Sequence, residues 1–556
     1  MNSPPVDVLS QNEDDKDIYL DPAIVEKTNN KVQTVVTNLS SEKKILLLPA
    51  VETQPFAKTL TLSTEEKLTP ERCKKLTDAL DILHLVNSEQ QTLKDIIFKY
   101  HEIFFLKGDR LRSNIQAVHK IPTKTSTPIY VKNYKAEVDK QMKELLDQGI
   151  IKAYNSPWNF PIWIVPKKQD KSEIQKWRIF IDYRKLNDIS YPDKFPLPQI
   201  NDIFDSLKNA KIFTTLDLAS GFHQIPIAPT DQPKTAFSTH NAHYKFCKMP
   251  FGLLNAPATF QRIMNKAPSG TIGNQCFVYL DDIIIYSRDF PTHLKNLEII
   301  FQRLKSNHLL IQLDKTEFLH NKVAYLGHII SDQGISPNPA KLENIKNCPQ
   351  PNNLKSVQHF LDIARYYRRF IQDYSKLTKP LSKLTHKNSE FKWTNLTQKC
   401  FETLKDCLTS DKLILQFPDF TKDFFLNTDA SQFAIGSVLS QYNDQTNLHP
   451  LSYTSRTLNS AEINYSTIEK ELLSIVWSIK HFRPYIYGRK FYVLSDHKPL
   501  VWLSNVKDPG SRLLHWKLKL SEYNFEIAHI SGTKNVVADA LSCILMIQPP
   551  TKYDGK

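Results

Sequence analysis

The spacing of apolar residues divides the chain into stretches with helical periodicity and stretches with strand periodicity. Residues 135–149 carry apolar positions at helical spacing and end at Gly149, which predicts an amphipathic helix. Residues 292–306 predict another, with Leu294, Leu297, Phe301 and Leu304 on one face. Helical patterns also dominate residues 340–410.

Short runs rich in β-branched and aromatic residues predict strands between about 158 and 285, and again after 420. The first region contains IWIVP, WRIFID, FTTLDL and the hairpin pattern CFVYLDDIIIYS (276–287). The second contains DFFLNTD, FAIGSVLSQ, HPLSYTS, KFYVLSD and FEIAHI, with a helix from 467 and a last helix near 536–542. The fold class is therefore a multidomain α+β and α/β protein, with two mixed regions joined by a helical stretch.

Composition indicates a class of binding partner and a cellular compartment. The 556 residues carry a formal net charge of +14, which favours a polyanion such as nucleic acid. Seven cysteines without a CxxC pair suggest neither a disulfide framework nor a zinc site, as expected in a reducing compartment. No apolar run is long enough to span a bilayer and no secretory signal pattern begins the chain, so an intracellular protein without a membrane partner is expected.

Three acids mark the ends of predicted strands in the first region. Asp217 closes FTTLDL, and the adjacent Asp281 and Asp282 lie in the hairpin pattern. The spacing allows a strand–helix–strand unit that brings these strand ends together. Two divalent cations about 4 Å apart, held by oxygen ligands, are what phosphoryl transfer requires. The three acids would supply such ligands, whereas an isolated Asp-Asp pair is more often a solvated turn.

The motifs around these acids carry a family resemblance. WRIFIDYRKLN (177–187), LDLASGFHQI (216–225), MPFGLLNAPATFQ (249–261) and YLDD (279–282) resemble, in order and spacing, the reverse transcriptases of Gypsy-type LTR retrotransposons. The resemblance implies a right-hand polymerase with fingers, palm and thumb. It implies that Asp217 and Asp281 are the main magnesium ligands and that Asp282 completes the triad with less direct coordination.

The same resemblance implies roles for residues around the triad. Lys167 and Arg178 would hold the incoming triphosphate, and Phe222 would exclude a ribose 2′-OH, although simple core packing also explains that ring. Phe251 stands where retroviral enzymes carry Gln and would line the nucleotide site. Leu326 and Gly327, in YLGH (325–328), would grip the primer end.

A second set of four acids follows in the C-terminal region: Asp429, Glu471, Asp496 and Asp539. On the helix that carries Glu471, Ser466 and Glu469 fit a Ser-x-x-Glu capping box, which already accounts for Glu469. Glu471 borders an apolar face, where a carboxylate is unfavourable unless it has a function such as metal ligation. The ordered set resembles the ribonuclease H domain that follows the polymerase in these elements, with two metals activating water. His529 is not assigned to this site, because it is expected to end a strand.

The segment FLDIARYYRRFIQDY (360–374) separates into two faces. Phe360, Ala364, Tyr367 and Ile371 fall at helical spacing and predict core positions. Arg365, Arg368 and Arg369 fall on another face, where they are able to follow a phosphate backbone or simply face solvent. By position the segment resembles a polymerase thumb.

The leading interpretation is an RNA- and DNA-directed DNA polymerase that also cleaves RNA in RNA–DNA hybrids during retrotransposon replication. Its expected cofactor is Mg²⁺, with Mn²⁺ as a substitute, two ions per site. Its expected partners are an RNA template, a DNA primer, the hybrid and dNTPs, in the cytoplasm within a virus-like particle and also in the nucleus. The oligomeric state stays open, a dimer being one option.

Two alternatives remain open at this point. One is a domesticated or truncated element kept as a nucleic-acid-binding protein without catalysis. The other, a cellular reverse transcriptase of the telomere-maintaining kind, is disfavoured by the ribonuclease H-like region. The segment NKAPSGTIGNQ (265–275) lacks the hydrophobic helical continuation expected before the hairpin, so a locally altered palm with reduced activity is expected.

The patterns and the resemblance together divide the chain into six parts. They are an N-terminal segment of unknown role expected to be partly disordered (1–65), a helical lead-in (66–134), fingers and palm (135–330), thumb and connection (331–395), a ribonuclease H-like domain (396–545) and a tail (546–556). Neither an Asp-Ser/Thr-Gly protease motif nor an integrase zinc cluster is found, so the chain is expected to be the middle of a larger polyprotein or a truncated copy.

Overall fold

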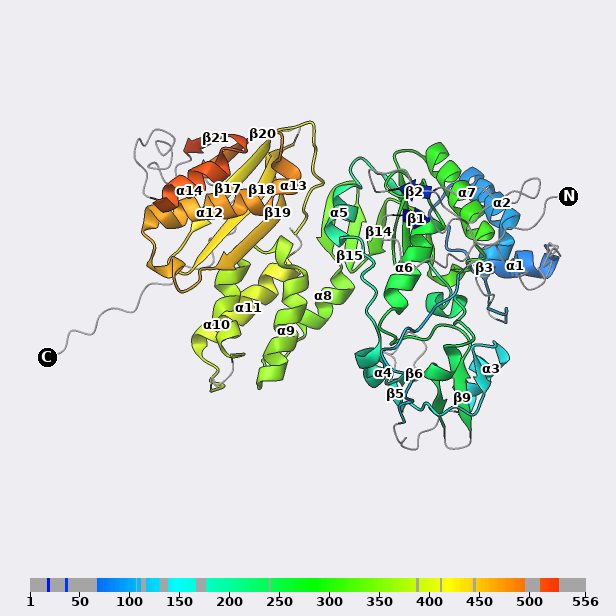
Figure 1. Cartoon of the computed structure of the whole chain (residues 1–556). Coiled ribbons are helices and arrows are strands. Elements are labelled where there is room, and N and C mark those ends of the chain that lie inside the picture. The colour runs from blue at the N-terminus through cyan, green and yellow to red at the C-terminus, as the bar shows by residue number, and fades with distance from the viewer. Residues whose placement is uncertain are drawn as a thin grey trace. The chain divides into compact units, whose positions relative to one another are not determined.

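The computed structural model describes residues 18–20, 36–38, 68–106, 108–111, 117–130, 139–166, 177–239, 242–386, 390–410, 413–443, 447–495 and 511–529. By its internal contacts the chain divides into two units, Met1–Lys67 and Leu68–Lys556. In the first unit, β1 (Ile18–Leu20) pairs antiparallel with β2 (Val36–Asn38). All elements that follow belong to the second unit (Figure 1).

The first part of this unit combines helices with short antiparallel sheets. Its elements are α1 (Pro70–Asp78), α2 (Asn87–Lys99), β3 (Phe104–Phe105), α3 (Asp139–Asp147), β4 (Ile151–Ala153), β5 (Ile162–Pro166), β6 (Trp177–Ile181), α4 (Arg184–Ile189), β8 (Phe237–Ser238) and β9 (His243–Phe246). β5 and β6 form a hairpin, and β9 lies between β4 and β8. The helix predicted over 135–149 is therefore present as α3, within two to four residues of the expected ends.

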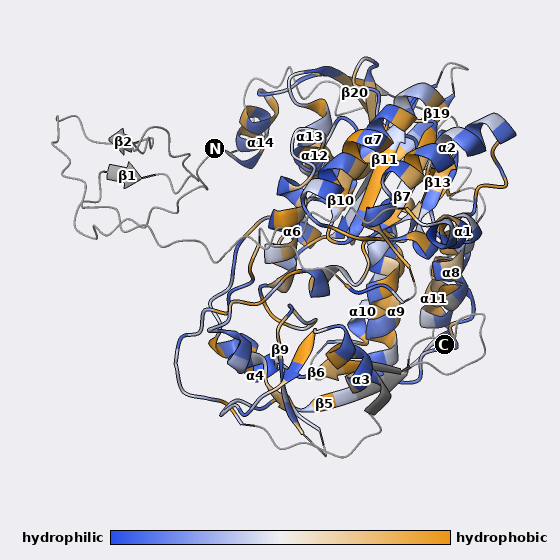
Figure 2. Ribbon diagram, turned by 90° about the vertical axis from the view of Figure 1, so that its right-hand side faces the viewer, coloured by the Kyte–Doolittle hydropathy of each residue, from blue (hydrophilic) through white to orange (hydrophobic). Residues whose placement is uncertain are grey.

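A four-stranded antiparallel sheet forms the centre, in the order β10-β11-β7-β13. The strands are β7 (Ile212–Asp217), β10 (Cys276–Tyr279), β11 (Asp282–Ser287) and β13 (Glu317–His320), accompanied by α5 (Ile200–Asp205), α6 (Ala256–Lys266), α7 (Phe290–Ser306) and β12 (Ile311–Gln312). Figure 2 shows the hydrophobic ribbon of β11 beside β7. β11 buries Ile283, Ile284 and Ile285 completely, so this sheet is anchored on both faces.

The altered segment before the hairpin is visible in the structure. α6 ends at Lys266, and the chain then runs through turns in which Gly270 and Gly273 take positive φ angles of 84° and 87°. The absence of a helical continuation is thus confirmed. The register of β10 against β11 nevertheless stays continuous from Cys276 to Tyr279, so the change does not break the hairpin.

Three strands and four helices follow the central sheet. They are β14 (Lys322–Tyr325), β15 (His328–Ser331), β16 (Gly334–Pro337), α8 (Pro339–Lys346), α9 (Leu354–Tyr366), α10 (Tyr374–Lys383) and α11 (Asn395–Thr409). The predicted core positions Phe360, Ala364, Tyr367 and Ile371 are all buried. They belong to one apolar cluster that also contains Phe213 and Ile284 of the central sheet.

The C-terminal region is a five-stranded mixed sheet in the order β19-β18-β17-β20-β21. Its elements are β17 (Phe424–Ala430), β18 (Ala434–Tyr442), β19 (Leu448–Thr457), α12 (Thr467–His481), α13 (Arg483–Ile486), β20 (Lys490–Ser495), α14 (Ser511–Leu520) and β21 (Asn524–His529). β17, β20 and β21 run parallel, and α12 packs on β17 and β18 through Leu472, Ile475 and Ile479. In the described part of the chain, no helix is long and apolar enough to cross a membrane.

The turn between β15 and β16 depends on a glycine. Gly334 has a φ of +133°, and a Cβ there would lie 2.2 Å from the carbonyl oxygen of Leu415. Two hydrogen bonds between Ile335 and Leu415, of 2.8 and 2.9 Å, hold the two segments at this distance. A side chain at this position would therefore force the segments apart.

We expect Gly334→Ala to lower the free energy of unfolding by about 3 kcal/mol, since backbone strain of ~1–2 kcal/mol adds to overpacking of ~1–3 kcal/mol. Chemical denaturation followed by tryptophan fluorescence measures the loss. Gly270→Ala is the matched control, because Gly270 also has a positive φ but a Cβ would meet nothing within 4 Å. Equal losses in the two variants would show that the contact with Leu415 is unimportant.

Candidate two-site carboxylate centre

The antiparallel pairing of β7 with β11 brings the first three acids together. Asp217 lies directly opposite Asp282 in the register, and Leu280 and Asp281 form the hairpin turn, with Leu280 at a φ of +54°. Directly opposed residues of antiparallel strands have Cα atoms about 4.5–5.5 Å apart. The Asp281 carbonyl accepts a 3.2 Å hydrogen bond from Leu218 N, which fixes the turn against the end of β7. The predicted convergence of these acids is confirmed.

The electrostatics reflect this crowding. Burial, and then the charges of Asp281 and Asp217, raise the pKa of Asp282 to about 6. Burial also raises the pKa of Asp217, although the Lys315 ammonium, 3.2 Å from its Oδ1, acts in the opposite direction. Within the described residues no three His, Cys, Asp or Glu side chains form a preformed metal cage, and Asp217 is engaged by Lys315 instead. The acids thus share a local excess of negative charge that a cation would relieve.

Two aromatic rings adjoin this centre. Phe222 is half-buried, with its ring centroid 4.9 Å from that of Phe251 and 5.1 Å from that of Phe260. A Cβ at Gly221 would lie 2.9 Å from Phe260 Cζ and 3.3 Å from Asp281 Cβ, so the backbone before Phe222 passes close to the acidic turn. Phe251 is 44% exposed. Phe222 therefore follows a backbone that passes close to the acidic turn, and Phe251 packs on Phe222; the contact of these rings with a nucleotide stays a prediction.

The two basic residues assigned to the triphosphate are only partly described. Lys167 lies outside the described residues. Arg178 lies on β6 opposite Val165, and only its backbone is described.

The turn assigned to the primer end is braced by groups that the sequence did not reveal. Leu326 and Gly327 have φ angles of +44° and +71°. Their carbonyl oxygens accept hydrogen bonds from Tyr366 Oη at 2.7 Å and Tyr367 Oη at 2.9 Å, respectively. Since Tyr325 Oη donates to the Asp282 carbonyl at 3.3 Å, the end of α9 is connected through this turn to the acidic hairpin.

The arginines of the same helix end do not share one environment. Arg365 and Arg368 are exposed, as the pattern predicts. Arg369 is only 9% exposed, and its guanidinium donates to Asn201 Oδ1 at 2.8 Å. The prediction that Arg369 faces a phosphate backbone is wrong, because the chain leaves α9 for a short 3-10 turn at Arg368–Phe370 and turns this side chain inward.

The described acids of the second set lie on neighbouring elements. Asp429 is near the end of β17, and its Oδ2 lies 2.6 Å from Lys376 Nζ of α10. Glu471 is buried on α12, which packs against β17. Asp496 and Asp539 lie outside the described residues. His529 ends β21, as expected.

The distinction between the two glutamates of α12 is confirmed. Ser466 Oγ accepts from Glu469 N, and Glu469 Oε2 accepts from Ser466 N at 2.9 Å, which is a capping box. Glu469 also accepts from Arg512 at 2.8 Å, so its charge is satisfied at the helix start. Glu471, two residues later, takes no part in the cap and faces inward.

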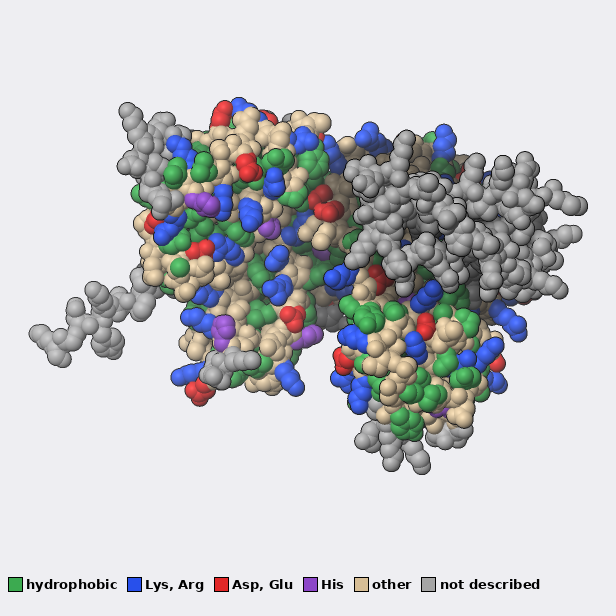
Figure 3. Space-filling view, viewed as in Figure 1, with side chains coloured by type: hydrophobic (Ala, Val, Ile, Leu, Met, Phe, Trp, Pro, Cys, Tyr) green, Lys and Arg blue, Asp and Glu red, His purple; other side chains and the backbone are tan. Residues whose placement is uncertain are grey.

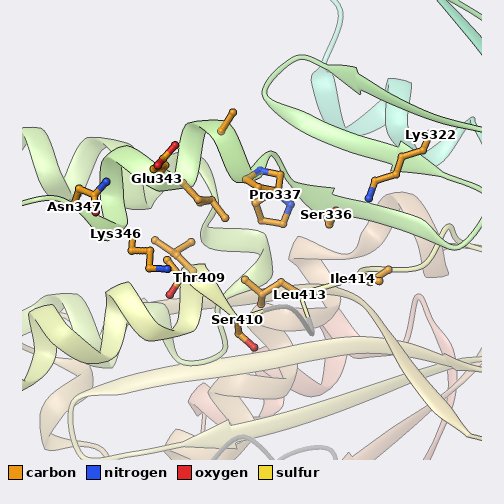
Figure 4. Close-up of a pocket in the computed structure, with 14 residues that line it drawn as sticks. Lys322, Ser336, Pro337, Glu343, Lys346, Asn347, Thr409, Ser410, Leu413 and Ile414 are labelled. Atoms are coloured by element: carbon orange, nitrogen blue, oxygen red, sulfur yellow. The ribbon is translucent and has the colours of Figure 1, made fainter. Parts of the chain in front are cut away.

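Both centres are distinct from a pocket formed after the central sheet. A pocket of about 590 Å³ lies between β16, α8 and α11, with Lys322, Glu343 and Lys346 among its polar lining residues (Figure 4). None of the predicted site residues that the structure describes lines it. Lys and Arg side chains are spread over the face shown in Figure 3 rather than gathered in one patch.

Comparison with known families agrees with this geometry. The family model "Reverse transcriptase (RNA-dependent DNA polymerase)" matches residues 165–330, and "RNase H-like domain found in reverse transcriptase" matches 419–523. The first match contains Asp217, Asp281 and Asp282, and the second contains Asp429 and Glu471. The domain boundaries on either side of these matches stay predictions.

Curated relatives come from retrotransposons. The chain is 46% identical to the retrovirus-related Pol polyprotein from transposon 297 of Drosophila melanogaster over 83% of its length, and 36% identical to that from transposon gypsy over 84%. It is 35% identical to the transposon Tf2-3 polyprotein of Schizosaccharomyces pombe over 75%. It spans less than half of these relatives, namely 44%, 46% and 31% of their lengths.

Solved structures show the same fold. A foamy viral protease-reverse transcriptase in complex with dsDNA matches with a TM-score of 0.71 at 24% identity, covering 83% of this chain and 97% of that one. A second, in complex with an RNA/DNA hybrid, matches with a TM-score of 0.67 at 23% identity, covering 97% of this chain and 71% of that one. The expected right-hand polymerase followed by a ribonuclease H-like domain is confirmed as the fold.

The raised pKa of Asp282 predicts a specific dependence of stability on pH. Because its folded pKa is raised from 3.8 to about 6, the neutral form is favoured by the fold, and this contribution is lost as pH rises from about 4 through 6. We expect the effect of Asp282→Asn on the free energy of unfolding to be more favourable at pH 7 than at pH 4. The difference between the two effects should be about 1–2 kcal/mol, after allowance for solvent screening. Denaturation midpoints at the two pH values measure it.

Asp289→Asn is the control of opposite sign. Hydrogen bonds from Thr292 lower the pKa of Asp289 at the start of α7, so this carboxylate stabilises the protein above its unfolded pKa and the contribution is lost in acid. Asp289→Asn should destabilise at pH 7. If both variants behaved alike, burial beside Asp281 and Asp217 would not be what raises the pKa of Asp282.

Proposed function

We propose that this chain, which belongs with the reverse transcriptase and ribonuclease H-like regions of gypsy-type retrotransposon Pol polyproteins, synthesises DNA on RNA and DNA templates and cleaves RNA in hybrids. The observation that carries the proposal is the register of β7 with β11, which sets Asp217 opposite Asp282 beside Asp281. Clustered carboxylates serve two-metal phosphoryl transfer, whereas plain nucleic-acid binding requires positive charge.

The donor chemistry of both centres fits Mg²⁺ or Mn²⁺. Asp217, Asp281 and Asp282 at one site, and Asp429, Glu471, Asp496 and Asp539 at the other, offer only carboxylate oxygens, which hard divalent cations prefer. Two ions at each site would stabilise the attacking and leaving oxygens of an in-line displacement. The raised pKa values of Asp217 and Asp282 support this assignment, since burial and the neighbouring carboxylates disfavour the charged forms although Lys315 acts in the opposite direction.

In synthesis, the primer 3′-OH attacks the α-phosphate of a dNTP and pyrophosphate leaves. Lys167 and Arg178 would hold the triphosphate, and their charge would stabilise the departing pyrophosphate. Phe222, packed between Phe251 and Phe260, would press against the sugar and exclude a 2′-OH. Leu326 and Gly327, held by Tyr366 and Tyr367, would position the primer end.

At the second site, water attacks a phosphodiester of the RNA strand. Glu471 is held in place by burial on α12, and the capping box fixes the start of the same helix. The partners of the whole activity would be an RNA template, a DNA primer, their hybrid and dNTPs, with Arg365 and Arg368 following the phosphates. We place this activity inside the cell, in a cytoplasmic virus-like particle and in the nucleus.

A divalent cation should stabilise the folded protein. We expect Mg²⁺ or Mn²⁺ at a hundredfold excess over its dissociation constant to contribute about 2.7 kcal/mol, seen as a rise in thermal midpoint. The double variant Asp281→Asn, Glu471→Gln should lose most of this rise, and Asp289→Asn, at a helix cap, should keep it. An unchanged rise in the double variant would place the cations elsewhere.

Single substitutions should separate the two activities. We expect Asp281→Asn to reduce primer extension at least about a hundredfold while sparing hybrid cleavage, and Glu471→Gln to do the reverse. Extension of a labelled primer and cutting of a labelled RNA–DNA hybrid measure the two, with Glu469→Gln as the matched control that retains both. Loss of both activities from either substitution in a folded protein would refute the two-site proposal.

A further inference from the structure

A buried polar cluster outside both acidic centres joins three stretches of the chain. Arg369 follows α9, Asp205 ends α5 beside the central sheet, and Tyr485 lies on α13 of the C-terminal region. Arg369 Nη2 lies 3.5 Å from Asp205 Oδ1, and Tyr485 Oη donates a hydrogen bond to Asp205 Oδ2. Asp205 therefore links the guanidinium of Arg369, which follows α9, to Tyr485 of the C-terminal region.

The same guanidinium makes two further contacts. Nη1 donates to Asn201 Oδ1 of α5 at 2.8 Å, and Nη2 donates to the Leu451 carbonyl of β19 at 3.3 Å. Its fork thus contacts α5 on one side and the C-terminal sheet on the other. A lysine would carry the charge but could not make these contacts at once, because its ammonium is a single point.

Other contacts continue this interface on both sides of the cluster. Lys208, just after α5, forms an ion pair with Asp419, just before β17. Val438 and Tyr453 of the C-terminal sheet belong to the same apolar cluster as Phe213 and Ile284 of the central sheet. The central and C-terminal sheets are therefore held through a continuous set of apolar and polar contacts.

The energetics of the cluster indicate that it fixes the arrangement of the interface more than it stabilises the protein. Burial raises the pKa of Asp205 although Arg369 opposes the effect, and Arg369 Nε is buried without a hydrogen-bond partner. Buried ion pairs of this kind contribute little net stability, because desolvation offsets their attraction. They do penalise any arrangement in which one partner is left alone, which restricts the interface to one geometry.

We propose that Arg369, Asp205 and Tyr485 form a positioning joint that sets the length of hybrid between the two acidic centres, and hence the site of RNA cleavage relative to the primer end. The inference rests on the proposed function. In duplex DNA successive nucleotides of one strand are about 3.4 Å apart along the axis, and a hybrid is somewhat more compact, so a displacement of about this size moves the cut by about one position. The joint does not touch the reacting atoms.

The test maps cut positions on a 5′-labelled RNA annealed to a recessed DNA primer. We expect the wild-type protein to cut within a narrow window measured from the primer 3′ end. In Tyr485→Phe and Arg369→Lys the window should shift or widen by at least one nucleotide, while primer extension and total cleavage stay within about threefold. Tyr487→Phe and Arg288→Lys, at exposed side chains, should keep the wild-type window. An unchanged window in both joint variants would overturn the inference.

A second measurement does not depend on activity. Bioorthogonal spin labels at exposed Lys295 of α7 and Lys480 of α12 report the distance between the central and C-terminal regions. The distribution should be narrow in the wild-type protein and broader in Tyr485→Phe, even if neither protein extends a primer. A wild-type protein without extension or cleavage would overturn the proposed function, whereas an identical distance distribution in both proteins would overturn the joint.

Discussion

The repulsion between carboxylates held on neighbouring strands is the constraint on which the rest of this structure depends. Asp217 and Asp282 oppose each other because six consecutive residue pairs of β7 and β11 are in register. A shift of one residue would move the isoleucines of β11 to the opposite faces of the sheet and exchange the two apolar clusters into which they pack, so the core fixes the position of the acids. The hydrophobic effect thereby maintains an arrangement of charges that electrostatics alone would disfavour.

In each acidic centre one carboxylate is paired with a lysine. Lys315 contacts Asp217 and Lys376 contacts Asp429, and each lysine comes from an element outside the strand that carries the acid. At the second centre, α10 approaches closely because Gly436 has no side chain, since a Cβ there would lie 2.8 Å from Asp373 Oδ1. Each centre is thus assembled from a strand end and a cation supplied by a neighbouring segment.

The segment after the central sheet ties the functional parts to one another. Its two adjacent tyrosines hold the turn beside the acidic hairpin, and the arginine two residues later holds α5 and the C-terminal sheet. Helical spacing assigned Tyr367 to the core, which is correct for its ring but does not predict what its hydroxyl contacts. Helical spacing also predicted that Arg369 faces a phosphate backbone. That prediction assumed that the helix continues past this residue, whereas α9 ends at Tyr366.

Local sequence determined the elements and the types of chemistry. Two runs of β-branched and aromatic residues predicted the hairpin of Asp281 and Asp282, and the capping box separated Glu469 from Glu471, because both depend on contacts within a few residues. Only the tertiary structure decided that Lys315 and Lys376 meet the acids, that Tyr366 and Tyr367 brace the turn, and that Arg369 is buried against Asp205. These partners lie far apart in the chain, and their contacts form only when apolar packing has brought separate sheets and helices together.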